Sequence, residues 1–219
     1  MNVSVPPTPI VLASASPRRR QLFQVLGVPF VVHTADADET PLSGEMPEQT
    51  AARLSRLKAS VVAARVDGVI VAADTLVVVD DEVLGKPADA AEAVKILRRL
   101  RGRSHRVVTG FTVLNSDSGD ADTAVVWSEV WMRDYSDAEI AAYVAGGDPL
   151  DKAGAYAIQH PTFMPVARLV GCPANVMGLP TCRVDEVLRA RGLALEATPT
   201  QSCRPARSRC AIRDLVLRG

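Results

Sequence analysis

A run of small, hydroxyl-bearing and basic residues near the start of the chain has the composition of an anion-binding site. The run is Ala13-Ser14-Ala15-Ser16-Pro17-Arg18-Arg19-Arg20. Ser16 is suited to cap a helix, and Pro17 suits the first helical position, where a missing N–H is no loss. Backbone N–H groups, serine hydroxyls and guanidinium groups would then meet at the positive end of a helix dipole. This arrangement favours a phosphate ligand, although a capped surface helix with solvated arginines would have the same sequence.

Carboxylates and lysines in unusual surroundings add a second kind of chemistry. Asp74 follows the apolar run Val69–Ala73, where a carboxylate is costly unless it is paired or bound to a metal. Lys58 falls among the apolar positions of a predicted helix, where a lysine usually extends its head to solvent. Lys86 stands between a glycine and a proline, and Glu39 ends an acidic loop that could simply be solvated. Acids that hold a metal and cations that neutralise phosphoryl oxygens together predict a polyphosphate site.

The predicted strands and helices alternate as in an open α/β sheet. Ligands collect at the carboxyl ends of strands in such sheets, and Ser14 and Asp74 are both predicted there. A short strand is also predicted to end at Gln159. The apolar patterns and turn residues predict strands at 10–12, 30–33, 69–73, 76–79, 82–84, 107–114, 123–132 and 164–170, and helices following Ser16, Pro47, Asp89, Ser136 and Pro180.

Composition argues against several classes of protein. The 219 residues carry 25 basic and 25 acidic side chains and only 4% aromatics, so nothing indicates a nucleic-acid or membrane partner. No apolar run is long enough to span a bilayer, and we expect no signal peptide. The cysteines lack CxxC spacing, so we expect them to be reduced, as in a cytoplasmic protein. They are Cys172, Cys182, Cys203 and Cys210.

Six motifs, in this order along residues 9–190, resemble the motif series of the Maf family. The resemblance implies an α/β fold in which helices flank an elongated mixed β-sheet, with two lobes and a central cleft, as in Maf- and ITPase-like proteins. It implies a nucleoside triphosphate pyrophosphatase that cuts the α–β phosphoanhydride bond with Mg²⁺ or Mn²⁺, and a homodimer is left open. The motifs are Leu12–Arg19, Ala73–Thr75, Gly85–Pro87, Gly102–His105, Asp151–Gln159 and Asn175–Pro180.

The resemblance also assigns roles to individual residues. It implies that Asp74 accepts a proton and binds metal together with Glu39, whose neighbours Asp36 and Asp38 lie in the same variable loop. The Asp151–Tyr156 stretch is similar to the branch that acts on dTTP and UTP. The remaining implied residues are the active-site lysines Lys58 and Lys86, the phosphate-loop residues Ser14, Ser16, Arg18 and Arg19, and the branch positions Arg18, Thr75 and Gln159.

Some features depart from the family pattern, and two other functions stay open. His160-Pro161 follows Gln159 where a glycine is expected. We predict one catalytic domain over residues 1–192 and a loosely ordered, arginine-rich tail over 193–219. The first alternative is a nucleotide-binding regulator of cell division that does not hydrolyse its ligand. The second is a nucleic-acid-binding module that uses Arg204, Arg207, Arg209 and Arg213.

Overall fold

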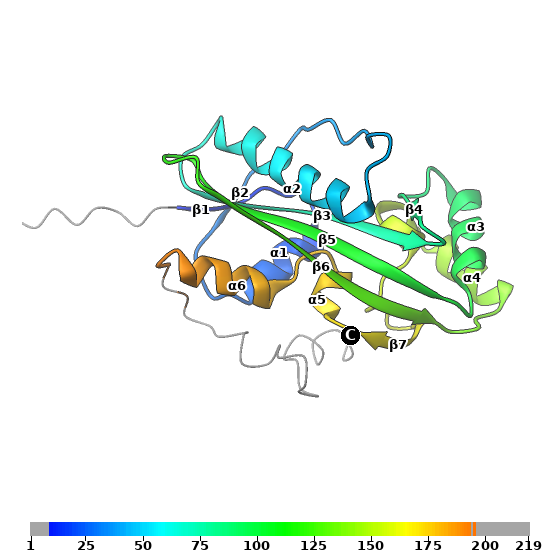
Figure 1. The fold of residues 1–219 in the computed structure, drawn as a ribbon. Helices are drawn as coiled ribbons and strands as arrows, with labels where there is room; N and C mark the ends of the chain where they lie inside the picture. Colours follow the sequence, from blue (N-terminus) through cyan, green and yellow to red (C-terminus); the bar gives the residue numbers. More distant parts are fainter. Residues whose placement is uncertain (1–8, 194, 196–219) are drawn as a thin grey trace, which may run out of the picture.

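A mixed β-sheet runs through the length of the molecule (Figure 1). The structure is a computed structural model and describes residues 9–193 and 195. The strand order is β2-β1-β3-β5-β6-β7, and β4 pairs with β3. Strand β1 is parallel to its neighbours β2 and β3, whereas the remaining pairs are antiparallel. The strands are β1 (Ile10–Leu12), β2 (Val31–Val32), β3 (Val69–Val79), β4 (Glu82–Leu84), β5 (Ser104–Asn115), β6 (Ala121–Met132) and β7 (Val166–Val170).

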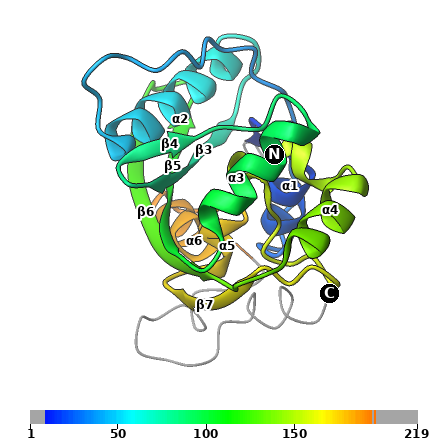
Figure 2. The ribbon, with the colours of Figure 1, turned by 90° about the vertical axis from the view of Figure 1, so that its right-hand side faces the viewer.

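Helices cover both faces of this sheet. Helix α2 (Pro47–Ala63) lies along one face, and α1, α5 and α6 lie on the other (Figure 1). Helices α3 and α4 pack against each other at one end of the sheet, and Figure 2 shows the molecule from that end. The other helical segments are α1 (Pro17–Gln24), α3 (Ala90–Leu100), α4 (Asp137–Ala145), α5 (Pro173–Val176), α6 (Thr181–Ala190) and the 3₁₀ turns η1 (Asp148–Asp151) and η2 (Ala153–Ala155).

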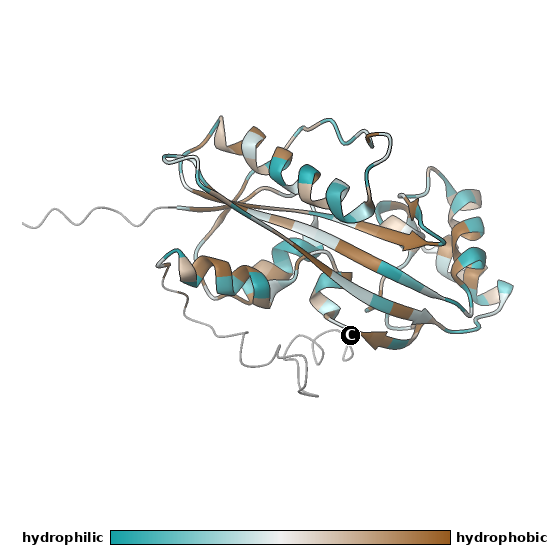
Figure 3. Cartoon of the chain, in the orientation of Figure 1, coloured by the Kyte–Doolittle hydropathy of each residue, from teal (hydrophilic) through white to brown (hydrophobic). Residues whose placement is uncertain are grey.

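The buried residues form two large hydrophobic cores, and the predicted division into two lobes stays a prediction. The first includes Phe23 of α1, Leu12 of β1 and Leu188 of α6. The second includes Leu97 of α3 and Tyr135, which precedes α4. The long central strands carry brown, apolar stretches interrupted by paler and more polar ones (Figure 3). The predicted α/β class, with a mixed sheet flanked by helices, is therefore confirmed, and the central cleft stays a prediction.

Three of the five predicted helix starts are confirmed by capping hydrogen bonds. The Ser16 side chain accepts a hydrogen bond from the backbone N–H of Arg19 at 3.4 Å, and Pro17 occupies the first turn of α1. Asp89 and Ser136 cap α3 and α4 in the same way. These side chains satisfy N–H groups that have no partner within the helix, and so they fix where each helix begins.

Three expectations are wrong. Strand β3 continues through Asp74 and Thr75 instead of breaking there, because β5 pairs with it from Val69 to Val78. The segment before Gln159 forms no strand, since Gly154 and Ala155 have φ values of +72° and +59° and turn the backbone. Cys182 is disulfide-bonded rather than reduced, so the cysteine argument for a cytoplasmic protein fails at this residue.

The end of the described chain returns to the first core. Leu193 packs against that core, and Leu195 is buried in it. Arg189 donates a hydrogen bond to the Leu195 carbonyl oxygen at 3.2 Å. The rest of the predicted tail, with the arginines of the nucleic-acid hypothesis, lies outside the described residues, so that domain boundary stays a prediction.

Candidate active site

A gap in strand pairing places the predicted phosphate loop beside Asp74. Strand β1 pairs with β3 as far as Val71, and β4 pairs with the same edge from Val77 onward. The loop that begins at Ala13 follows β1 directly, and the Ala13 N–H donates to the Val71 carbonyl oxygen at 2.8 Å. Ser14 therefore lies at the carboxyl end of a strand, as predicted. Asp74 lies in the middle of its strand, and it reaches the site because β1 ends so early.

Asp74, Lys58 and Glu39 form an ion-paired cluster on the α2 face of the sheet. The Lys58 ammonium lies 2.6 Å from Asp74 Oδ1 and 3.0 Å from Glu39 Oε1. Asp74 is 6% exposed and Lys58 is 8% exposed, so this lysine does not extend to solvent. Removing one partner would leave the other as a buried, uncompensated charge. The structure thus brings together three of the four predicted catalytic residues.

Gly110 allows α2 to come close enough for this ion pair. It lies directly opposite Asp74 in the β3–β5 register, on the same face of the sheet. A Cβ atom at this position would lie 2.3 Å from the backbone carbonyl carbon and oxygen of Ala51 in α2. Because Lys58 is two helical turns beyond Ala51, the missing side chain sets how near the ammonium comes to the sheet.

Thr75 and Arg19 meet on the opposite face, since neighbouring residues of a strand point to opposite sides. The Arg19 guanidinium donates to the Gly178 carbonyl oxygen at 2.8 Å and to the Thr75 hydroxyl at 3.1 Å. Burial lowers the pKa of Arg19; the Asp74 charge opposes this shift, the Arg18 charge adds to it, and the Glu39 charge opposes it. The Arg19 guanidinium therefore senses the Asp74 charge without a direct contact.

The phosphate loop has an internal hydrogen bond, and Arg18 is held by a residue from another segment of the chain. Ser14 is buried, and its hydroxyl accepts a hydrogen bond from the Ser16 N–H at 3.2 Å. Arg18 donates from Nη1 to Asp151 Oδ2 at 3.1 Å, with 22% of its side chain exposed. The predicted set Ser14, Ser16, Arg18 and Arg19 therefore surrounds the first turn of α1.

Lys86 and Gln159 stand apart from these contacts. Lys86 is exposed and forms no ion pair with the residues that the structure describes. The buried amide oxygen of Gln159 has no hydrogen-bond partner among those residues. His160 is structural, because its Nδ1 accepts the Phe163 N–H at 3.0 Å and its ring packs on Tyr143.

A buried hydrogen-bonded chain behind the site is invisible in the sequence pattern. The Thr75 hydroxyl pairs with that of Thr109 at 2.9 Å, and Thr109 donates to the Asn175 carbonyl oxygen at 3.1 Å. The Asn175 side chain donates to Ser128 and is fully buried. Asn175 belongs to one of the quoted motifs, whereas the threonine and the serine are ordinary strand residues whose role depends on strand register.

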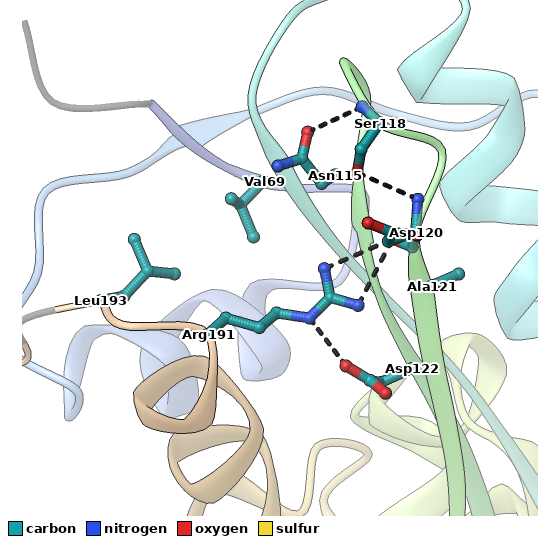
Figure 4. Close-up of a pocket in the computed structure, with 8 residues that line it drawn as sticks. All are labelled: Val69, Asn115, Ser118, Asp120, Ala121, Asp122, Arg191 and Leu193. Carbon is teal, nitrogen blue, oxygen red and sulfur yellow. Dashed lines mark hydrogen bonds and ion pairs between the residues drawn. The ribbon is translucent and has the colours of Figure 1, made fainter.

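The cavity drawn in Figure 4 lies elsewhere, at the turn between β5 and β6. Its volume is about 580 Å³, and Arg191 reaches across it. The Arg191 guanidinium pairs with Asp122 at 2.7 Å and donates to the Asp120 carbonyl oxygen at 3.3 Å. None of the predicted site residues lines this cavity, which is bounded by Val69, Asn115, Ser118, Asp120, Ala121, Asp122, Arg191 and Leu193.

The donors available for a metal are few. Among the described residues, no three His, Cys, Asp or Glu side chains form a cluster that could hold an ion by themselves. Asp74 and Glu39 nevertheless fit Mg²⁺, which usually takes one or two protein carboxylates together with waters and substrate phosphates.

No helix in the described part of the chain is long and apolar enough to cross a membrane.

Comparison with known proteins shows close relatives over most of the chain. A dTTP/UTP pyrophosphatase of Geobacter sulfurreducens is 48% identical over 84% of this chain and 96% of its own length. One from Thermomicrobium roseum is 45% identical over 93% of both. A HAM1 protein from Coxiella burnetii aligns at 14% identity over 84% of this chain and 99% of its own, with a TM-score of 0.45, a likeness that adds nothing here. The model of the family described as Maf-like protein matches residues 9–191, and the chain therefore belongs to this family.

Proposed function

We propose that this protein is a nucleoside triphosphate pyrophosphatase that hydrolyses the α–β phosphoanhydride bond of dTTP, UTP and related nucleotides. The observation that carries the proposal is the buried Asp74–Lys58 pair, whose Asp74 charge also acts on Arg19 in the first turn of α1. Relatives named dTTP/UTP pyrophosphatase, which match this chain over most of its length, support the substrate class.

In this proposal the two ends of the site have different tasks. Asp74 accepts the proton of the attacking water, and its contact with the Lys58 ammonium holds the carboxylate in place. Ser14 and the positive N-terminal end of α1 bind phosphoryl oxygens, as helix N-termini do. Arg19 already uses two donors on protein oxygens, so its orientation is set before the substrate arrives. Lys86, being exposed, is free to reach the departing diphosphate.

A divalent cation completes this proposal. Asp74 and Glu39 would hold it, with the phosphates supplying further oxygens. Bound there, Mg²⁺ or Mn²⁺ would polarise the phosphoryl group and offset its developing charge. The Lys58 ammonium bridges the carboxylates of Asp74 and Glu39, and its positive charge holds these two side chains close together.

The environment of Gln159 favours a substrate whose pyrimidine base carries an N–H donor. Its buried amide oxygen has no partner among the described residues, and a buried acceptor of this kind is costly unless a ligand satisfies it. The N3–H of uracil or thymine is such a donor, whereas cytosine presents an acceptor at that position. We therefore propose that uridine and thymidine nucleotides are better substrates than cytidine nucleotides. We also propose that the protein acts in the cytoplasm.

The test measures diphosphate release from dTTP, UTP and CTP, with inorganic pyrophosphatase as the coupling enzyme and phosphate as the readout. We expect Asp74→Asn to lower kcat by at least about 100-fold, the low end for a lost acid–base group. The exposed Asp117 in the β5–β6 turn gives a matched control, Asp117→Asn, which should be unchanged. A fully active Asp74→Asn variant would refute this role, and a wild-type protein that binds but never cleaves nucleotides would favour the regulator.

A further inference from the structure

A charged cluster on the segment between α4 and β7 lies just outside the residues assigned above. Lys152 is 7% exposed, although lysine is rarely buried this deeply unless its charge is paired. Its ammonium contacts Asp151 Oδ1 at 2.6 Å and Asp148 Oδ1 at 3.1 Å, and it donates to the Asp148 carbonyl oxygen. The two acids satisfy the buried cation from the turn η1.

Asp151 faces two cations at once. One carboxylate oxygen binds Lys152, and the other accepts the hydrogen bond from Arg18 Nη1 at 3.1 Å. Burial opposes ionisation of Asp151, but the hydrogen bond from Lys152 and the charge of Arg18 outweigh it and hold the pKa of this carboxyl below its usual value. The carboxylate therefore stays charged and joins the η1 segment to the first turn of α1.

This segment is itself anchored to the sheet. The Gly154 N–H donates to the Gly85 carbonyl oxygen at 3.1 Å, next to Lys86. A Cβ atom at Gly154 would lie 3.0 Å from the side chain of Val77, so the backbone packs tightly against β3. Asp148 is fixed independently, because it accepts the Tyr143 hydroxyl at 2.7 Å. Lys152 thus connects a rigid part of the second core to the phosphate loop.

We propose that Lys152 is a positioning residue, which acts through Asp151 to hold the Arg18 guanidinium where it meets the triphosphate. This proposal rests on the proposed function and adds a residue that does not touch the substrate. Among the described residues, the Arg18 side chain forms a hydrogen bond and ion pair only with Asp151, so its direction depends on that carboxylate. Without the buried ammonium, Asp151 would be free to rotate into solvent, because its side chain is 58% exposed.

The experiment is a double-mutant cycle between Lys152→Met and Arg18→Ala. Binding of α,β-imido-dUTP, which cannot be hydrolysed at that bond, is measured by calorimetry, and kcat and KM are measured with dTTP. We expect Lys152→Met to weaken binding and raise KM by about 10- to 100-fold, the range for a misplaced binding group, while kcat changes less than about threefold. In the Arg18→Ala background the same substitution should change binding less than about twofold.

The controls separate positioning from a general effect on the fold. Lys152→Arg keeps the charge and should restore at least part of the lost affinity, and Asp151→Asn should reproduce the defect even if Lys152→Met does not fold. Unchanged affinity in Lys152→Met, or an equal loss with and without Arg18, would overturn the proposal. Failure of the wild-type protein to bind or cleave any triphosphate would instead refute the proposed function.

Discussion

Replacing Gly110 with alanine tests whether the spacing between α2 and the sheet controls the site. The new Cβ atom would meet the backbone of Ala51 at 2.3 Å, and the nearest atom of Ala52 at 2.6 Å. Carbon atoms in contact lie about 3.5–4.0 Å apart, so α2 must move away by about 1 Å. Lys58 moves with the helix, and its 2.6 Å contact with Asp74 is lost or lengthened.

Two magnitudes follow for Gly110→Ala. Overpacking of this kind costs about 1–3 kcal/mol of folding free energy. A displacement of about 1 Å in a catalytic group can lower the rate by about 100-fold. Urea unfolding measures the first, and kcat/KM for dTTP, from coupled phosphate release, measures the second.

Two further variants make the Gly110 test specific. Gly146→Ala, at the end of α4 with φ −71°, should leave kcat/KM unchanged, because its Cβ atom meets only the Tyr143 carbonyl oxygen at 3.3 Å. Ala51→Gly should not rescue Gly110→Ala, because the clashing atoms are backbone. Wild-type stability and activity in Gly110→Ala would refute the reasoning, and rescue by Ala51→Gly would show that a side chain sets the spacing.

The remaining predictions concern charge and metal. Burial lowers the pKa of His105 to about 4 from an ordinary 6.5, so between these values the unfolded chain binds a proton that the folded chain excludes. Stability should therefore fall by about 3 kcal/mol as the pH drops from 7 to 4, and His105→Gln should lose that part of the dependence in urea unfolding. Lys58→Met should destabilise the protein by about 3–5 kcal/mol, and adding Asp74→Asn should recover part of the lost stability. A Lys58→Met variant as stable as the wild-type protein would contradict the buried ion pair. EDTA should abolish diphosphate release, and Mg²⁺ or Mn²⁺ should restore it; activity that survives chelation would exclude the metal.

Local patterns in the sequence predicted most elements because each had its own physical signal. Ser16, Asp89 and Ser136 marked helix starts through their capping side chains, and the stripe from Ala93 to Leu100 marked the buried face of α3. The short helix α5 was missed, since four residues are too few to show helical periodicity.

The site was predictable as a set of residues but less so as a geometry. Lys58 looked like a lysine that would extend to solvent, and only the packing of α2 on β5 reveals its ion pair with Asp74. Asp74 seemed to end a strand because its carboxylate interrupts an apolar run. The long pairing partner β5, far along the chain, keeps the strand continuous. Such non-local pairing cannot be read from a single segment.

The shortness of β1 has a consequence for how this sheet can change. Only three residues of β1 pair with β3, and β4 pairs with the same edge after a gap of five residues, 72–76. The edge of β3 is therefore open over this gap because β1 is short, and no particular side chain is needed to keep it open. If β1 were two residues longer, it would pair with more of this open edge of β3 and displace the loop that carries Ser14. Insertions at residues 13–16 should therefore be far more harmful than insertions of equal size in the β5–β6 turn.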